Sequence, residues 1–315
     1  MLKHRLLMSA LLIPGTIALF ALDDFLGPSA PVLLALVMVV AARCVWELVI
    51  LARSAGFRPN LVLCLLGSWL MILTAWCPAL RWRIAWQQWT QPLFTNHLFL
   101  LPAGGVVIVV MLFNAVMRFS YFEPPVDRDV STPQPGRQLA TLGVELFVVA
   151  YVGVLLALTV QLRWTAHPPD DVVNIGYFAL AALVIATKMG DVGAYTFGRL
   201  IGGPKMTPRL SPGKTWAGGV GHLATAGLCS VAWLCWLGPM ISTRWPAWSV
   251  VSAAVFGVVV GFAGLMGDLA ESLIKRDVGV KDAPTLLPGF GGLLDLMDSL
   301  LLAGPVAYVL WNLLL

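Results

Sequence analysis

The sequence has 315 residues, of which 59% are hydrophobic and 11% are charged, and its formal net charge is +4. This apolar content exceeds the need of a soluble domain, and the small net charge gives no indication of a nucleic-acid partner. Apolar segments long enough to cross a bilayer recur along the chain. The composition therefore predicts an all-α, polytopic integral membrane protein.

Nine apolar segments are predicted to be transmembrane helices, separated by turn residues such as Gly27-Pro28, Pro59 and Pro168-Pro169. They cover about residues 6–22, 31–51, 59–77, 93–117, 140–162, 172–190, 216–237, 247–267 and 293–314. The first is similar to a signal peptide, but the many spans that follow favour an uncleaved helix. No long linker divides the chain, so we expect one membrane-embedded unit. Its N-terminal helices cover 1–137, and its catalytic region covers 138–315.

The distribution of lysine and arginine predicts the orientation. With the N-terminus in the cytoplasm, fourteen of these residues fall on the inner side and four on the outer side, as the positive-inside rule requires. Two polar loops, 188–215 and 268–292, then lie on the cytoplasmic side, where nucleotides are available. We therefore expect any site built from these two loops to face the cytoplasm, and the expected location is a bacterial inner membrane.

The first polar loop is predicted to bind phosphate. Its end, Ser211-Pro212-Gly213-Lys214-Thr215, combines hydroxyl groups and a cation directly before an expected helix start near Thr215. Backbone N–H groups at a helix N-terminus, with a lysine beside them, bind phosphate well. The loop is not a Walker A motif, because Pro208 stands where that motif needs glycine. The alternative is a basic loop that contacts lipid headgroups.

The second polar segment, Gly267–Ser299, is predicted to bind a divalent metal ion. Asp295 and Asp298 are three residues apart at the start of the last span, so both can face one ion. Asp268 ends the preceding span, and the chain must fold back between them. Carboxylate ligands favour Mg²⁺, with Mn²⁺ as the alternative, and one or two ions fit the number of ligands. The competing interpretation is a solvated loop with surface ion pairs.

These motifs resemble the phosphatidate cytidylyltransferase (CDP-diacylglycerol synthase) family. Its long signature is matched by Ser272, Lys275, Arg276, Lys281, Asp282, Pro288, Gly291, Gly292, Asp295 and Asp298. Its upstream elements are matched by Ala194, Tyr195, Gly198 and Arg199, and by Ser211, Pro212, Lys214, Thr215, Trp216 and Gly218. The specific matches cover residues 188–300. The N-terminal half is similar to the family only as a set of apolar spans.

The resemblance implies transfer of a cytidylyl group from CTP to phosphatidate, which gives CDP-diacylglycerol and pyrophosphate in phospholipid biosynthesis. It implies that Asp268, Asp295 and Asp298 bind magnesium. It assigns phosphate binding to Lys275, Arg276 and Lys281, and positioning of a cation or the nucleotide to Asp282. We expect nucleotide or pyrophosphate binding by the matched residues Arg199, Ser211, Lys214 and Thr215, and by Asp191, which lies just before the first upstream element. CTP, phosphatidate and membrane lipids are the expected partners, and a homodimer is allowed.

Three positions depart from the family pattern: Phe290 replaces the usual histidine, Leu296 the usual arginine and Ala217 the usual glutamate. An altered substrate or an inactive scaffold protein therefore stays an alternative. Another membrane enzyme that uses CTP, such as a polyprenol kinase, is a second alternative. An ion-binding transporter is a third, although the charges gather at one membrane face. The CDP-alcohol phosphotransferases are less compatible, because their acidic pattern is absent.

Overall fold

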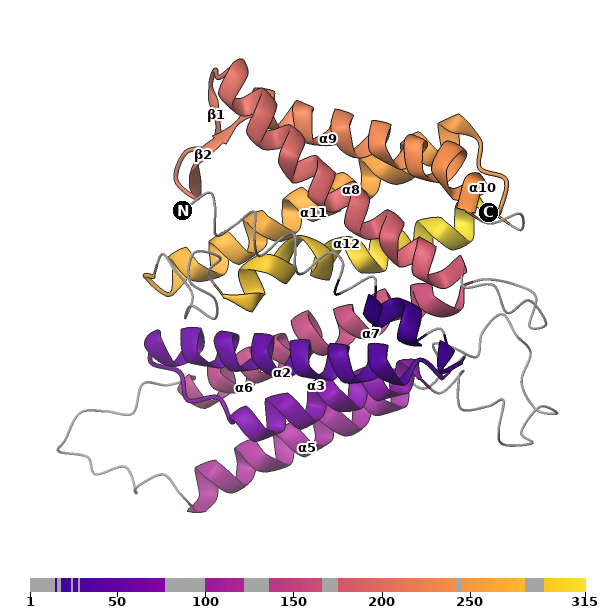
Figure 1. Ribbon diagram of the computed structural model, residues 1–315. Coiled ribbons are helices and arrows are strands. Elements are labelled where there is room, and N and C mark those ends of the chain that lie inside the picture. Colours follow the sequence, from indigo (N-terminus) through magenta and orange to yellow (C-terminus); the bar gives the residue numbers. More distant parts are fainter. Residues whose placement is uncertain are drawn as a thin grey trace. The chain divides into compact units, whose positions relative to one another are not determined.

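The computed structural model describes residues 15, 18–23, 25–27, 29–76, 100–121, 136–165, 175–241, 245–280 and 292–315 (Figure 1). The predicted all-α fold is confirmed, because the described part consists of helices and one short β-hairpin. Seven of the described helices are long and apolar enough to span a membrane, and Leu61–Ala75 is a shorter apolar helix. The expected first span, 6–22, lies mostly outside the described residues, so the predicted total of nine is not confirmed.

The chain forms two compact units. Unit 1 comprises Met1–Leu33 and Leu158–Leu315, and unit 2 comprises Leu34–Ala157. The division at residue 137 that the sequence suggested stays a prediction. Most of α2 (Pro31–Ser54) lies in unit 2, together with α3 (Leu61–Ala75), α5 (Leu100–Tyr121), α6 (Arg137–Val148) and the π-helix η1 (Val149–Val154). The short helix α7 (Leu155–Val160) follows η1.

Side chains from α3, α5, α6 and η1 form the core of unit 2. They include Met71, Val107, Met111, Leu142 and Val149. Helices α3 and η1 approach closely, because a Cβ atom on Gly153 would lie 2.7 Å from the Cα of Ser68. Small residues at such crossings allow helices to pack in a membrane, where apolar burial from water gives no driving force.

Unit 1 contains the 3₁₀-helix η2 (Gln161–Trp164) and the long helices α8 (Ile175–Leu200), α9 (Trp216–Val231), α11 (Val250–Asp277) and α12 (Leu293–Leu314). The π-helix η3 (Ala232–Leu237) and α10 (Gly238–Ile241) continue α9. Helix α9 packs against α8 and α11, and α11 packs against α12. The antiparallel strands β1 (Lys205–Thr207) and β2 (Ser211–Thr215) connect α8 to α9.

Two expected helix ends are wrong. Helix α8 continues to Leu200 and α11 to Asp277, so segments predicted as loops after residues 190 and 267 are helical. Hydropathy marks only the apolar part of a helix, whereas these polar extensions are stabilised by pairs of side chains one turn apart. Arg199 donates to the Tyr195 hydroxyl at 2.7 Å, and Lys275 pairs with Glu271 at 2.9 Å.

The contact between α11 and α12 depends on Gly267, since a Cβ atom there would lie 2.4 Å from the carbonyl oxygen of Asp298. We expect Gly267→Ala to destabilise unit 1 by about 1–3 kcal/mol, because the helices must separate. Thermal denaturation of the purified protein measures this effect. The matched control is Gly105→Ala in α5, where an added Cβ meets no atom of the described residues within 4 Å. Equal melting temperatures for the two variants would contradict the close contact.

Candidate active site

A cavity of about 530 Å³ opens between α8, β2, α9 and α11 in unit 1. Its lining combines cations, an acidic side chain from each of two helices, and glycines. It is formed by Asp191, Ala194, Tyr195, Gly198, Arg199, Met206, Gly213, Lys214, Thr215, Gly218, Gly219, His222, Leu265 and Asp268. Two segments that are distant in sequence, 191–222 and 265–268, therefore meet at one site.

The start of α9 contributes backbone donors to this cavity. As predicted, the helix begins directly after Thr215, whose hydroxyl oxygen accepts a hydrogen bond from Gly218 N at 3.1 Å. The hairpin fixes this start, because Trp216 N donates to Pro204 O at 3.1 Å. Gly218 and Gly219 line the cavity without side chains that would cover the backbone. The positive end of the helix dipole therefore faces a space suited to an anion.

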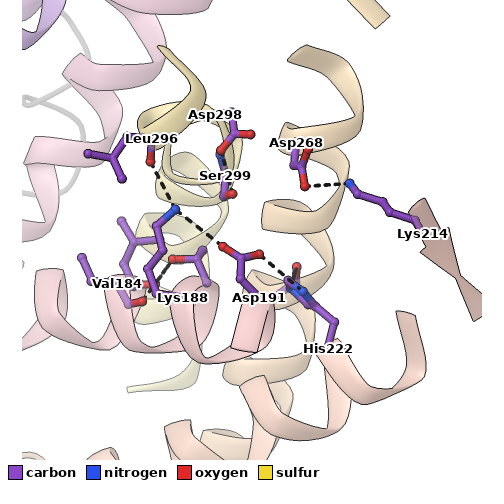
Figure 2. Close-up of polar contacts among 12 residues, drawn as sticks. Val184, Lys188, Asp191, Lys214, His222, Asp268, Leu296, Asp298 and Ser299 are labelled. Carbon is purple, nitrogen blue, oxygen red and sulfur yellow. Dashed lines mark hydrogen bonds and ion pairs between the residues drawn. The ribbon is translucent and has the colours of Figure 1, made fainter. Parts of the chain in front are cut away.

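Four of the five residues predicted to bind nucleotide line this cavity: Asp191, Arg199, Lys214 and Thr215. Asp191 and Arg199 project from α8, whereas Lys214 and Thr215 end β2. Ser211 begins β2 and is not among the lining residues. The ammonium group of Lys214 on β2 lies 2.7 Å from a carboxylate oxygen of Asp268 on α11 (Figure 2).

Three carboxylates form an acidic cluster beside the cavity: Asp268, Glu271 and Asp298, from α11 and α12. One oxygen from each lies within 4.8 Å of the other two. Asp268 is partly exposed, whereas Glu271 and Asp298 are only 2% and 5% exposed. Positive charge beside such a cluster lowers the repulsion between its carboxylates, and lysine ammonium groups lie 2.7 Å from Asp268 (Lys214) and 2.9 Å from Glu271 (Lys275). Asp268 and Asp298, which the sequence analysis grouped, are thus side by side in the structure.

Asp298 is held firmly at this cluster. Its carboxylate accepts hydrogen bonds from the backbone N–H and, at 2.8 Å, the hydroxyl of Ser299. The Gly267 contact places the Asp298 backbone directly against α11. The position of this carboxylate therefore follows from the tight crossing of α11 and α12.

The third predicted metal ligand, Asp295, makes different contacts. It accepts from Lys275 Nζ at 2.8 Å and from Gly292 N at 3.1 Å, so it caps the start of α12. Lys275 also lies 2.9 Å from Glu271, and this ammonium group connects Asp295 to the acidic cluster. The metal role of Asp295 stays a prediction. In the acidic cluster, the third carboxylate beside Asp268 and Asp298 is that of Glu271.

Of the remaining predicted site residues, the structure brings none that it describes to the cavity or to the acidic cluster. Arg276 is exposed, and its Nε donates to Leu210 O in the hairpin turn at 3.5 Å. Lys281 and Asp282 lie outside the described residues, as do Pro288, Phe290 and Gly291 of the family signature. Their predicted roles stay predictions.

Comparison with known proteins agrees with this geometry. The sequence pattern described as the cytidylyltransferase family matches residues 3–314, which is nearly the whole chain. The chain belongs to the cytidylyltransferase family. The resemblance noted from residues 188–300 is thereby confirmed, and it extends into the N-terminal half.

Several curated relatives in this family are similar to the chain. Phosphatidate cytidylyltransferase of Mycobacterium bovis is 31% identical over 214 residues, which cover 67% of this chain and 63% of the relative. Its namesake in Chlamydia pneumoniae is 34% identical over 170 residues, covering 53% of each chain. That of Brucella suis is 37% identical over 134 residues, covering 42% of this chain and 47% of the relative. The matches thus cover less than two thirds of each relative's length.

Sequence reasoning missed three residues at or beside this candidate site: Lys188, His222 and Glu271. Lys188 contacts Leu296 O at 3.2 Å and Asp191 at 3.6 Å, so it links α12 to α8 (Figure 2). His222 is fully buried, with Nε2 2.9 Å from Gly261 O and Nδ1 3.7 Å from Asp191. A single histidine or lysine within an apolar helix gives no spacing signal. Glu271 was detectable, because it is one turn after Asp268.

Proposed function

We propose that this cytidylyltransferase-family protein transfers a cytidylyl group from CTP to phosphatidate, giving CDP-diacylglycerol and pyrophosphate. One observation carries the proposal: the cations and helix start of the 530 Å³ cavity adjoin three clustered carboxylates. The cavity offers anion-binding groups for a triphosphate, and the carboxylates offer oxygen ligands for a divalent cation. The names of the curated relatives support the same reaction.

The reaction joins two anions, so its main difficulty is electrostatic repulsion. A phosphate oxygen of phosphatidate forms a bond to the α-phosphorus of CTP, and the bond to pyrophosphate breaks. The nucleophile is already an anion and needs no strong base. Lys214, Arg199 and the N–H groups at the start of α9 bind and orient the phosphates in this proposal. Fixed donors of this kind stabilise charge without reorganisation during the reaction.

The acidic cluster fits Mg²⁺. Its three donors are carboxylate oxygens, which hard divalent cations prefer. Each of these oxygens lies within 4.8 Å of the other two, so small side-chain movements would bring all three to a metal–oxygen distance of about 2.1 Å. We therefore propose that Asp268, Glu271 and Asp298 hold the ion. When bound, Mg²⁺ neutralises negative charge on the reacting phosphates.

The active site is proposed to face the cytoplasm of a bacterial cell, in the inner membrane. The protein is an integral membrane protein by its seven long apolar helices. The excess of lysine and arginine on one side supports this orientation, since basic residues favour the cytoplasmic side. CTP is available there, and phosphatidate can reach the site from the inner leaflet.

Mass spectrometry of lipid products tests the proposed reaction directly. The purified protein in proteoliposomes is incubated with CTP, Mg²⁺ and phosphatidate of defined acyl chains. We expect CDP-diacylglycerol with the same acyl chains and an equal amount of pyrophosphate. Addition of EDTA should abolish both products. Phosphorylation of a polyprenol, or intact CTP and phosphatidate, would refute the proposed reaction.

A further inference from the structure

Unit 2 contains a second cavity, of about 540 Å³, lined by Arg53, Gly56, Phe57, Arg58, Pro59 and Arg118. It lies where α2 ends, α3 begins and α5 approaches its end. Among the described residues, half of those that line it are arginines and none is acidic. We call it the arginine cavity. No residue of the proposed active site contributes to it.

The end of α2 orders the turn that carries Arg53 and Arg58. Gly56 has a φ of +88°, its N–H donates to Arg53 O at 3.0 Å, and Phe57 N donates to Ala52 O at 3.1 Å. These two bonds define a Schellman motif, in which the positive φ favours glycine. Arg53 Nη2 donates to Pro59 O at 3.3 Å, which ties the arginine to the far side of the turn. The arginine cavity is therefore formed by an ordered turn.

Two hydrogen bonds hold the guanidinium group of Arg118 in place. Its guanidinium donates to Glu145 at 3.2 Å and to Arg58 O at 2.9 Å. Glu145 is buried and also accepts from Asn60 N at 2.6 Å, next to the start of α3. This carboxylate offsets one of the three positive charges. Among the described residues, two positive charges then remain at the arginine cavity.

The guanidinium of Arg58 has no hydrogen-bond or ion-pair partner among the described residues. Its backbone is held by Arg118, while its exposed side chain is available to a ligand. Planar guanidinium groups bind phosphate through paired N–H···O bonds. We propose that the arginine cavity binds the phosphate group of an anionic membrane lipid. This inference does not rest on the proposed enzymatic activity.

The surroundings favour a lipid over free phosphate. The predicted spans Pro31–Ser54 and Leu100–Arg118 both end at the arginine cavity, so it lies at the depth of lipid headgroups. Along α5, the side chains of Leu112, Phe113 and Val116 are exposed and apolar. They offer a surface for acyl chains next to Arg118. A soluble phosphate would use the guanidinium groups but not this surface.

Native mass spectrometry of the purified full-length protein tests the site. Phosphatidylglycerol and phosphatidylcholine with identical acyl chains are titrated separately into wild-type protein, Arg58→Gln and Arg53→Gln/Arg58→Gln. We expect preferential binding of phosphatidylglycerol, weakened about fivefold by the single change and about 25-fold by the double change. Arg209→Gln, an exposed arginine in the β1–β2 turn, is the matched control and should bind as wild type. Melting temperatures verify that each variant is folded.

A competition with inorganic phosphate distinguishes the two sources of a phosphate group. We expect little displacement of phosphatidylglycerol, since acyl chains contribute to binding. Efficient displacement would keep the phosphate site but overturn the assignment of a lipid as its occupant. Equal phosphatidylglycerol binding by wild type and the folded double variant would overturn the site itself. Loss of binding in Arg209→Gln as large as in Arg58→Gln would show a nonspecific charge effect and would also overturn it.

Discussion

Replacing Asp298 with asparagine is expected to lower CDP-diacylglycerol formation about 100-fold to 1,000-fold. The change preserves the shape of the side chain but removes one negative charge from the acidic cluster. This carboxylate is buried and accepts a hydrogen bond from the Ser299 hydroxyl. An exposed side chain nearby cannot easily supply a negative charge at the same position. Loss of one fixed electrostatic group of this kind typically costs two to three orders of magnitude in rate. Incorporation of labelled CTP into lipid in proteoliposomes measures the effect.

Asp277→Asn is the matched control for this change. Asp277 is the exposed last residue of α11 and belongs neither to the acidic cluster nor to the cavity lining. It should retain nearly wild-type activity. If Asp298→Asn were as active as Asp277→Asn, the acidic cluster would have no part in catalysis.

Replacing Lys214 with glutamine is expected to reduce kcat/KM for CTP about 100-fold. Its ammonium group lies in the cavity, 2.7 Å from Asp268 and beside the start of α9. The variant loses the cation that we assign to phosphate binding. It also places an uncharged amide, in place of an ammonium group, beside the Asp268 carboxylate. Steady-state kinetics at varied CTP and saturating phosphatidate measure the loss.

Lys205→Gln, in the paired strand of the same hairpin, controls for general charge and folding effects. Lys205 is exposed and lies opposite Thr215 in the strand register, but it does not line the cavity. We expect its kcat/KM to stay within about twofold of wild type. A similar loss in both variants would indicate a general electrostatic effect in place of a specific contact at Lys214.

The helical class and most spans could be predicted from sequence, because apolar length is a direct signal for a membrane-spanning helix. The ends of α8 and α11 could not. Both helices extend beyond their apolar parts through Asp191–Arg199 and Asp268–Asp277, where hydropathy falls but helical side-chain pairs continue. The start of α9 was predictable, since Thr215 is a residue type that favours the N-cap position and it directly precedes an apolar segment.

The candidate site was only partly predictable for a related reason. The family motif identified Asp298 and the end of the preceding span identified Asp268, but neither identified Glu271 as their neighbour in space. Treating residues after 267 as a loop concealed the one-turn spacing of Asp268 and Glu271, which becomes clear once α11 is extended. His222 gave no signal at all, because its relation to Asp191 depends on the packing of α8 against α9.

Titration with Mn²⁺, followed by electron paramagnetic resonance without CTP, tests the central claim that the acidic cluster binds a divalent cation. We expect one site in the wild type, at least about tenfold weaker in Glu271→Gln and in Asp298→Asn. Asp295→Asn should weaken the site less than Glu271→Gln, since Asp295 contacts Lys275 and Gly292. Wild-type protein that binds no Mn²⁺, or equal binding by wild type, Glu271→Gln and Asp298→Asn, would contradict the claim.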